Sequence, residues 1–211
     1  MCMVDKDLVN PKNTAILVID IQNDYCSEKG ILAKAHNLDM RPVQAIIPKI
    51  SAFLNVARKY KIPIIWTQAI EDPDYLKPNA AFKIRSGPKQ LVIATPGTWG
   101  FDYYKIRPLA GDFKIVKKGY DSFVNPQLNA ILRQKKTKNV IVCGVYTAVC
   151  VDTTVRSAYR LGYNVVVPRD LVAMPKQRWH LHEAALLNMD MIFAHVLSSE
   201  EIIKIWEKFH S

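Results

Sequence analysis

The stretch VIVCGVYTAVCVDTTVRSA, residues 140–158, combines two hydrophobic patterns and holds two of the chain's four cysteines. Its first part, Val140–Gly144, is a short apolar, β-branched run closed by glycine, as in a buried strand. From Ala148 onward, apolar residues recur at helical spacing. The stretch therefore predicts a strand, a short turn and a helix. Cys143 would pack inside the strand, and Cys150 would lie in the first turn of the helix.

Cys150 is the cysteine that this arrangement places where chemistry occurs. The first turn of a helix has unpaired backbone N–H groups and the positive end of the helix dipole, and both favour a thiolate. The alternative is that Cys150 is a small buried hydrophobic side chain, as free cysteines often are.

Strand-like and helical runs alternate along the whole chain. Near-continuous apolar strands separated by helices indicate a mostly parallel sheet with helices on both faces. We therefore expect an α/β fold, a three-layer α/β/α sandwich around a six-stranded sheet, with residues 1–211 forming one domain. The expected strands are 14–20, 62–67, 112–117, 139–144, 164–170 and 191–196, and the expected helices are 42–60, 126–134, 148–161, 178–189 and 198–209.

The composition is that of a folded protein, with 211 residues, 49% hydrophobic and 23% charged. The first residues lack the apolar core of a signal peptide, and the longest apolar stretch is too short to span a bilayer. The cysteines at positions 2, 26, 143 and 150 show neither metal-site spacing nor a disulfide framework. These features predict a cytoplasmic protein without a membrane partner. Cys26 is interpreted as incidental, the alternative being a second accessible thiol.

The net charge of +10 raises the possibility of nucleic-acid binding. The basic residues are scattered, however, and the densest cluster, residues 133–138, lies where a helix is expected to end. Cations complement a helix C-terminus, so a solvated helix end is the favoured interpretation. We expect no nucleic-acid partner, although the charge favours anionic substrates by electrostatic steering.

Three chemically useful side chains fall at or just beyond the ends of expected strands. Ligands of parallel sheets gather beyond the carboxyl ends of the strands, so this position selects Asp20, Lys117 and Cys150 as a candidate catalytic set. Lys118 competes with Lys117, because only one of two neighbouring strand residues points inward. No glycine-rich phosphate-binding pattern follows any strand, so we expect no nucleotide cofactor.

In these places the sequence resembles the isochorismatase-like cysteine hydrolase family. The resemblance extends from Thr14 to Ile203, and the order and spacing of its motifs are more specific than any one of them. In the family, the lysine precedes a phenylalanine by six residues, which selects Lys117 through Phe123. The motifs are LVIDIQNDY (17–25), KKGYDSF (117–123), CGVYTAVCVDTTVRSAYRLGYNVVVPRDLVA (143–173), HEAALLNM (182–189) and AHVLSSEEII (194–203).

The resemblance implies the same three-layer fold, commonly assembled into oligomers, and an Asp–Lys–Cys triad. Asp20 would be the general base, Lys117 its cationic partner and Cys150 the nucleophile. The family also implies a non-proline cis peptide at Val145–Tyr146, which would direct the N–H of Tyr146 toward the same point as that of Cys150. These two N–H groups would form the oxyanion hole.

Substrate contacts are less defined by the sequence. Gln22, Trp66 and Tyr146 are candidate substrate-binding residues. For Gln22 the alternative is that it organises the loop with Asn23 and Asp24, and for Trp66 that it is a buried aromatic.

The segment 70–110 matches the family least and is expected to select the substrate. Arg85, Arg107 and Trp99 are candidates there to meet a substrate carboxylate, although surface placement is favoured for both arginines.

The expected function is metal-free hydrolysis of the C–N bond of a small amide, ureide or N-carbamoyl compound through a thioester. Residues 67–82 contain no histidine, which argues against the metal cluster of the nicotinamidases and predicts no metal or other cofactor. One alternative is vinyl-ether hydrolysis of the isochorismatase type, and another is a non-hydrolytic thiol redox sensor. The expected partners are a small-molecule substrate and further copies of this chain.

Overall fold

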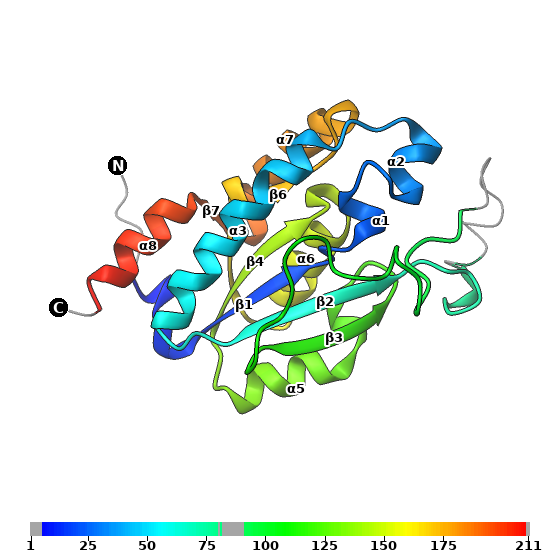
Figure 1. Cartoon of the computed structure of the whole chain (residues 1–211). Helices are drawn as coiled ribbons and strands as arrows, with labels where there is room; N and C mark the ends of the chain where they lie inside the picture. Colours follow the sequence, from blue (N-terminus) through cyan, green and yellow to red (C-terminus); the bar gives the residue numbers. More distant parts are fainter. Residues whose placement is uncertain (1–5, 80, 82–90, 210–211) are drawn as a thin grey trace.

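The computed structural model describes residues 6–79, 81 and 91–209 (Figure 1). Within these residues, seven strands form one parallel sheet in the order β3-β2-β1-β4-β5-β7, and the short β6 pairs with β4. The predicted fold class is confirmed, with a short strand more than the six expected. The strands are β1 Thr14–Ile19, β2 Ile64–Ile70, β3 Phe113–Lys118, β4 Asn139–Val145, β5 Asn164–Pro168, β6 Val172–Ala173 and β7 His195–Leu197.

Helices cover both faces of the sheet, as the apolar strands require (Figure 1). One buried cluster joins the sheet to α3 and α8, and the other joins it to α5 and α6. The helices are α1 Asn23–Cys26, α2 Ile31–His36, α3 Arg41–Lys59, α5 Pro126–Gln134, α6 Asp152–Arg160, α7 Trp179–Asn188 and α8 Ser199–Glu207, with π-helical turns at Thr147–Val151 and Met189–Phe193.

Strand β1 shows why the central strands lack polar alternation. Ile16 and Val18 point into the cluster beneath α3, whereas Leu17 and Ile19 point into the cluster beneath α5 and α6. Every residue of β1 is buried. Fully burying one such side chain stabilises the fold by about 1.5–3 kcal/mol, so both faces favour apolar residues.

The prediction of a strand at 191–196 is wrong over most of these residues. Met189–Phe193 forms a π-helical turn, and β7 begins only at His195. The Asp190 carboxylate accepts a hydrogen bond from the Val196 N–H at 3.0 Å, which fixes the turn against the new strand. Periodicity alone does not separate a short apolar strand from a helical turn, and Met191 is in fact 70% exposed.

The carboxyl ends of β1 and β4 approach each other closely where the predicted catalytic residues emerge. Asp20 follows β1 in the left-handed region at φ 52°, which is costly for a residue other than glycine. Gly144 in β4 has φ 116°, and a Cβ at this position would overlap the carbonyl of Ile19. A glycine at 144 thus permits the contact that positions Asp20.

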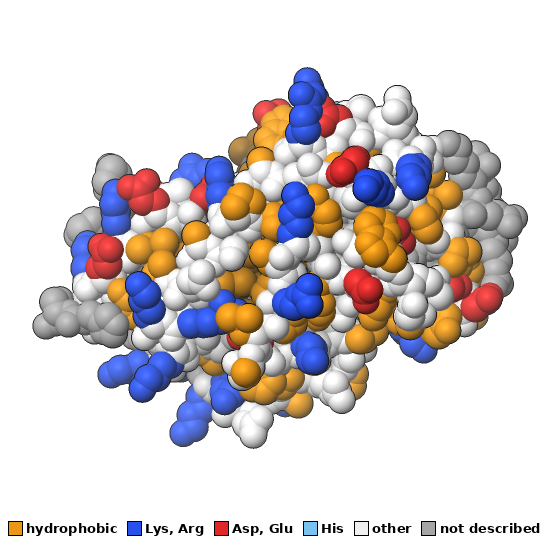
Figure 2. Space-filling model, in the orientation of Figure 1, with side chains coloured by type: hydrophobic (Ala, Val, Ile, Leu, Met, Phe, Trp, Pro, Cys, Tyr) orange, Lys and Arg blue, Asp and Glu red, His pale blue; other side chains and the backbone are white. Residues whose placement is uncertain are grey.

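The surface in Figure 2 carries Lys and Arg side chains dispersed among acidic and hydrophobic ones. Of the helices that the structure describes, none has the length and apolar character needed to cross a membrane.

Candidate active site

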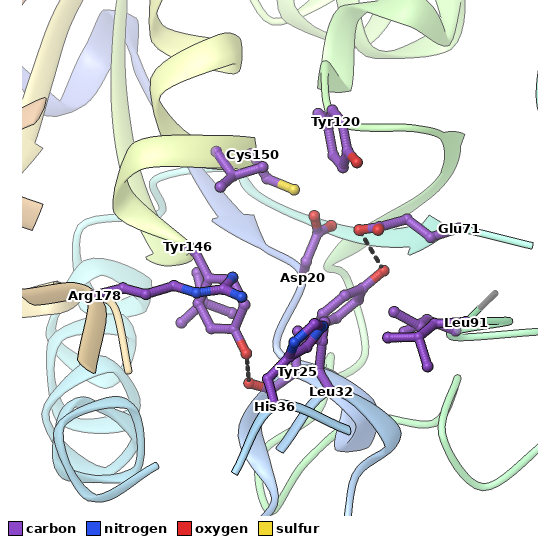
Figure 3. A pocket seen from close by; sticks show the side chains of 13 residues that line it. Asp20, Tyr25, Leu32, His36, Glu71, Leu91, Tyr120, Tyr146, Cys150 and Arg178 are labelled. Carbon is purple, nitrogen blue, oxygen red and sulfur yellow. Dashed lines mark hydrogen bonds between the residues drawn. The ribbon is translucent and has the colours of Figure 1, made fainter. Parts of the chain in front are cut away.

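A cavity of about 420 Å³ lies at the carboxyl edge of the sheet, beyond the ends of β1, β2 and β4 (Figure 3). It contains two of the three predicted catalytic side chains, Asp20 and Cys150, and the third, Lys117, lies directly behind Asp20. The cavity is lined by Asp20, Tyr25, Leu32, His36, Glu71, Leu91, Ile93, Tyr120, Val145, Tyr146, Val149, Cys150 and Arg178.

Asp20 is held from two neighbouring strands. Its Oδ1 accepts a hydrogen bond of 2.6 Å from the Thr67 hydroxyl on β2, and its Oδ2 lies 2.8 Å from Nζ of Lys117 on β3. The Asp20 side chain is 1% exposed. These contacts fix the carboxylate in one orientation within the cavity.

Lys117 is the buried member of the lysine pair, as the spacing predicts. Its Nζ donates to the carbonyls of Gly119 and Tyr120 at 2.8 and 2.7 Å, in addition to its ion pair with Asp20. Burial alone would lower the pKa of Lys117, but the charges of Asp20, Cys150 and Glu71 together with the contact to Asp20 outweigh it, and the pKa is raised. Lys117 therefore remains a cation, while Lys118 is exposed.

Cys150 lies in the π-helical turn Thr147–Val151, one turn before α6, rather than in the first turn of the α-helix. Its side chain is buried, and burial is the main cause that raises the pKa of the thiol well above its ordinary value. The charge of Lys117 lowers this pKa, whereas the charges of Asp20 and Glu71 raise it. The effect expected of the helix start, which favours a thiolate, does not prevail over burial, and the thiol needs a base.

The turn before Cys150 is built as expected. The peptide bond Val145–Tyr146 is cis. Tyr146 lines the cavity, and its hydroxyl donates to the carbonyl of Tyr25 at 2.6 Å. Thr147 is fully buried, and its hydroxyl lies 2.8 Å from Nδ1 of His182 on α7.

Gln22 and Trp66, predicted to bind substrate, lie outside the cavity wall. The Gln22 amide donates to the carbonyls of Ala69 and Phe101 and accepts from the Ala69 N–H, so it joins the loop to β2. Trp66 lies inside β2, and its indole N–H donates to Asp112 at 2.9 Å. Gln22 therefore organises the loop, and Trp66 is a buried aromatic, which are the alternative interpretations given for these residues.

The other candidates of the variable segment also lie away from the cavity. Arg107 is exposed beside a separate hollow, and Trp99 is 51% exposed. Arg85 lies outside the described residues. Cys26 is fully buried in the core, so it is not a second accessible thiol. Cys143 is likewise buried, inside β4, as predicted.

Five polar residues of the cavity were not predicted from the sequence: Tyr25, His36, Glu71, Tyr120 and Arg178. Glu71 had a usable signal, because it directly follows β2 and the strand-end rule would have selected it. Strand β2 was expected to end at Thr67, but it continues to Ile70. Tyr25 and His36 lie on the short helices α1 and α2, which were not expected from the hydrophobic pattern, and Tyr120 and Arg178 lie between the longer elements.

Among the described residues, no three His, Cys, Asp or Glu side chains are grouped so that they could hold a metal ion.

The fold is that of the isochorismatase-like hydrolases. It superimposes on a cysteine hydrolase from Pseudomonas syringae pv. phaseolicola with a TM-score of 0.82 at 23% identity, covering 95% of both chains. An N-carbamoylsarcosine amidase from Thermoplasma acidophilum gives a TM-score of 0.70 at 23% identity, covering 89% of this chain and 96% of that one.

Sequence comparison agrees with the fold. Residues 14–201 match the Isochorismatase domain, and this chain therefore belongs to the isochorismatase family of hydrolases. It is 30% identical over 206 residues to a ureidoacrylate amidohydrolase, RutB, from Caulobacter segnis, covering 92% of this chain and 85% of the relative.

Proposed function

We propose that this protein hydrolyses the C–N bond of a small amide, ureide or N-carbamoyl compound through a thioester at Cys150. The observation that carries the proposal is the position of the Asp20 carboxylate, which is paired with Lys117 at 2.8 Å and lines the same cavity as the Cys150 thiol. Asp20 is the general base, Lys117 its cationic partner and Cys150 the nucleophile. Relatives named ureidoacrylate amidohydrolase support this class of reaction.

In the first step Asp20 takes the thiol proton as sulfur attacks the carbonyl carbon. The negative charge moves to the carbonyl oxygen, and Lys117 compensates the charge in the pair of Asp20 and Cys150. When the tetrahedral intermediate collapses, the C–N bond breaks and protonated Asp20 returns the proton to the departing nitrogen. Water then attacks the thioester with Asp20 again as base, which frees the acid and restores the thiol.

The oxyanion is stabilised by the backbone N–H groups of Tyr146 and Cys150. The turn Thr147–Val151 brings both residues to the cavity wall. Loss of one such donor typically reduces kcat by about 100- to 1000-fold.

Arg178 suggests an anionic substrate. It lines the cavity beside Tyr146, and within the described residues it forms no ion pair (Figure 3). A guanidinium is suited to a planar carboxylate. We therefore propose that the substrate carries a carboxylate besides its scissile C–N bond, as the name of the ureidoacrylate-cleaving relatives implies for their substrate.

The thiol-sensor alternative receives no support from the site. A sensor needs an accessible, low-pKa thiol. Cys150 is 4% exposed, and burial raises its pKa. A sensor also has no use for Asp20 and Lys117 beside the thiol.

We further propose that the protein is a cytoplasmic homo-oligomer. Exposed apolar side chains gather on α7 and the turn that follows it: Leu181, Leu187, Met191 and Ile192. Such a surface is typical of a subunit interface. The free thiols of Cys26, Cys143 and Cys150 suit a reducing compartment. Analytical ultracentrifugation that finds a monomer at micromolar concentration would contradict the oligomer.

The proposed function is tested by measuring ammonia or amine release from a panel of amides, ureides and N-carbamoyl amino acids. Wild-type protein should release product from at least one class, and Cys150→Ala should release none. Mass spectrometry of quenched reactions should show an acyl or carbamoyl adduct on Cys150. Turnover by the alanine variant, or oxidation as the one detectable modification of Cys150, would contradict the proposal.

A further inference from the structure

Glu71 is a second carboxylate in the cavity, and the triad does not use it. It follows the last residue of β2, and its backbone N–H donates to the Ile93 carbonyl at 3.2 Å. Its Oε1 accepts a hydrogen bond of 3.0 Å from the Tyr25 hydroxyl. Over the part of the chain that the structure describes, Oε2 has no hydrogen-bond partner.

The position of Glu71 relative to the nucleophile is shown in Figure 3. The Glu71 carboxylate points toward the space in front of Asp20, with Tyr120 beside it. Arg178 enters the cavity from the opposite side, next to Tyr146. A substrate whose carbonyl meets Cys150 therefore lies between a cation at one end and Glu71 at the other.

In the part of the chain that the structure describes, Glu71 forms no ion pair. Lys117, whose charge acts on Glu71, is engaged at 2.8 Å by Asp20, and the charge of Asp20 opposes ionisation of Glu71. Burial raises the pKa of Glu71 to about 7. The titratable groups around it are Tyr25 on α1, Asp20 after β1, Asp72 after β2, Lys117 on β3, Tyr120 after β3, and Cys150. His36 and Arg178 line the same cavity, and Lys77, Lys118 and Asp121 line a second hollow that Glu71 also borders.

A half-paired carboxylate in a cavity destabilises the fold, whereas an amide or apolar side chain would not. Residues that oppose stability and line an active site are typically retained for function. The unpaired Oε2 is an acceptor, so its complement is an N–H donor on the substrate.

We propose that Glu71 determines specificity by accepting a hydrogen bond from the carbamoyl nitrogen that remains on the carbonyl carbon, so that the site selects N-carbamoyl compounds over N-acyl compounds. This inference rests on the proposed function and names the substrate class within it. When Cys150 attacks R–NH–CO–NH₂, the amine R–NH₂ leaves with the proton held by Asp20, and Cys150–S–CO–NH₂ remains. Water then gives carbamic acid and the free thiol. In an N-acetyl compound a methyl group, which has no N–H, takes the place of the NH₂ group.

The placement of the two charged groups also orients the substrate. Glu71 repels a substrate carboxylate and accepts from a carbamoyl NH₂, while Arg178 attracts the carboxylate. The carbamoyl end therefore faces Glu71, and the leaving amine with its carboxylate faces Arg178.

The test compares the N-carbamoyl and N-acetyl derivatives of one amino acid. The carbonyl carbon carries an NH₂ group in the first compound and a CH₃ group in the second. For Glu71→Gln, kcat/KM on the carbamoyl compound should fall about 10- to 100-fold, because the donor must now meet an amide that already accepts from Tyr25. The value for the acetyl compound should change less than about threefold. If wild type does not cleave the acetyl compound, its inhibition constant replaces kcat/KM.

Two controls complete the experiment. Glu183→Gln, the same change at an exposed position of α7, should leave kcat/KM unchanged for both compounds. Thermal unfolding of Glu71→Gln shows whether the variant is folded, and the retained Tyr25 bond predicts that it is.

If kcat/KM of Glu71→Gln falls equally for the carbamoyl and acetyl compounds, or falls for neither, the inference is overturned and the proposed function stays intact. Failure of the wild type to cleave any amide or ureide instead contradicts the proposed function itself, and the inference with it.

Discussion

Nζ of Lys117 lies 2.8 Å from Oδ2 of Asp20, and both side chains are withdrawn from solvent, at 0% and 1% exposure. Removing one partner of a buried ion pair leaves an uncompensated charge, which typically destabilises a protein by about 3–5 kcal/mol. Lys117 also donates to the carbonyls of Gly119 and Tyr120. The lysine therefore joins the end of β3 to the end of β1, and it serves both structure and the proposed chemistry.

Lys117→Ala should lose on the order of 3 kcal/mol or more of transition-state stabilisation, which is at least about a 100-fold fall in kcat/KM. The cause is the loss of the cation that compensates Asp20 and lowers the pKa of Cys150. Steady-state kinetics measures the effect, and circular dichroism establishes that the variant is folded.

Lys118→Ala is the matched control, because Lys118 is the exposed neighbour on the same strand. It should change stability and rate little, within about 0.5 kcal/mol. If Lys118→Ala were inactive and Lys117→Ala active, the proposed role of Lys117 would be wrong.

Cys150→Ser should abolish hydrolysis and leave the fold intact. Serine fills nearly the same volume in the turn, but its hydroxyl is a much weaker nucleophile than a thiol that transfers its proton to Asp20. Pre-steady-state mass spectrometry should detect an adduct on the wild-type cysteine and none on the serine variant. Turnover by Cys150→Ser within tenfold of wild type would remove Cys150 from the mechanism.

The layers of the fold could be predicted because each central strand is apolar on both faces. Ala15–Ile19 and Val140–Val145 are buried throughout, and such runs read as strands of a covered parallel sheet. Ser198 and Glu201 form a capping box at the start of α8, a local pattern that two residues three positions apart are enough to set. The turn at Met189–Phe193 was not predictable, since a short apolar run fits a strand equally well.

The site could be predicted where a strand end or a motif fixes a residue, as for Asp20 and Lys117. The rest depends on tertiary packing. Trp66 was misassigned because β2 runs past it to Ile70, which places the indole in the core. The raised pKa of Cys150 follows from burial, which helix position does not reveal.

Glu71→Gln should be more stable than wild type at pH 8, and the difference should vanish in acid. The pKa of Glu71 is raised by burial from 4.5 to about 7 in the folded protein. The folded protein favours the protonated form of Glu71. The contribution of Glu71 to the free energy of unfolding is therefore fully present below pH 4.5 and is lost as the pH rises through about 7. The variant avoids this loss, which corresponds to about 3 kcal/mol for a pKa raised from 4.5 to about 7.

Urea unfolding at pH 4.5 and pH 8 measures this difference. Glutamine keeps an acceptor for the Tyr25 hydroxyl, so the comparison isolates the charge. A variant that is less stable than wild type at pH 8 would show that the ionised carboxylate is favourably held in the fold.

The last prediction concerns the contact between Thr147 and His182. Thr147 begins the turn that presents Tyr146 and Cys150, and its hydroxyl lies 2.8 Å from Nδ1 of His182. His182 is buried, and its ring stacks on Trp179 with centroids 4.1 Å apart. Burial lowers the pKa of His182 from 6.5, so the ring is neutral at neutral pH and its contribution to stability is lost as the pH falls through the lowered value.

Thr147→Val keeps the shape of the side chain but leaves the ring nitrogen without its buried partner, which should destabilise the protein by about 1–3 kcal/mol. The turn should also hold its two N–H groups less firmly. Because oxyanion donors act mainly in the transition state, kcat should fall about tenfold or more while KM changes little. Thr98→Val, the same change at an exposed threonine whose hydroxyl donates to the Thr95 carbonyl, should change stability within about 0.5 kcal/mol and leave the rate unchanged. A Thr147→Val variant with raised KM and unchanged kcat would instead place Thr147 in substrate binding, with no part in supporting the turn.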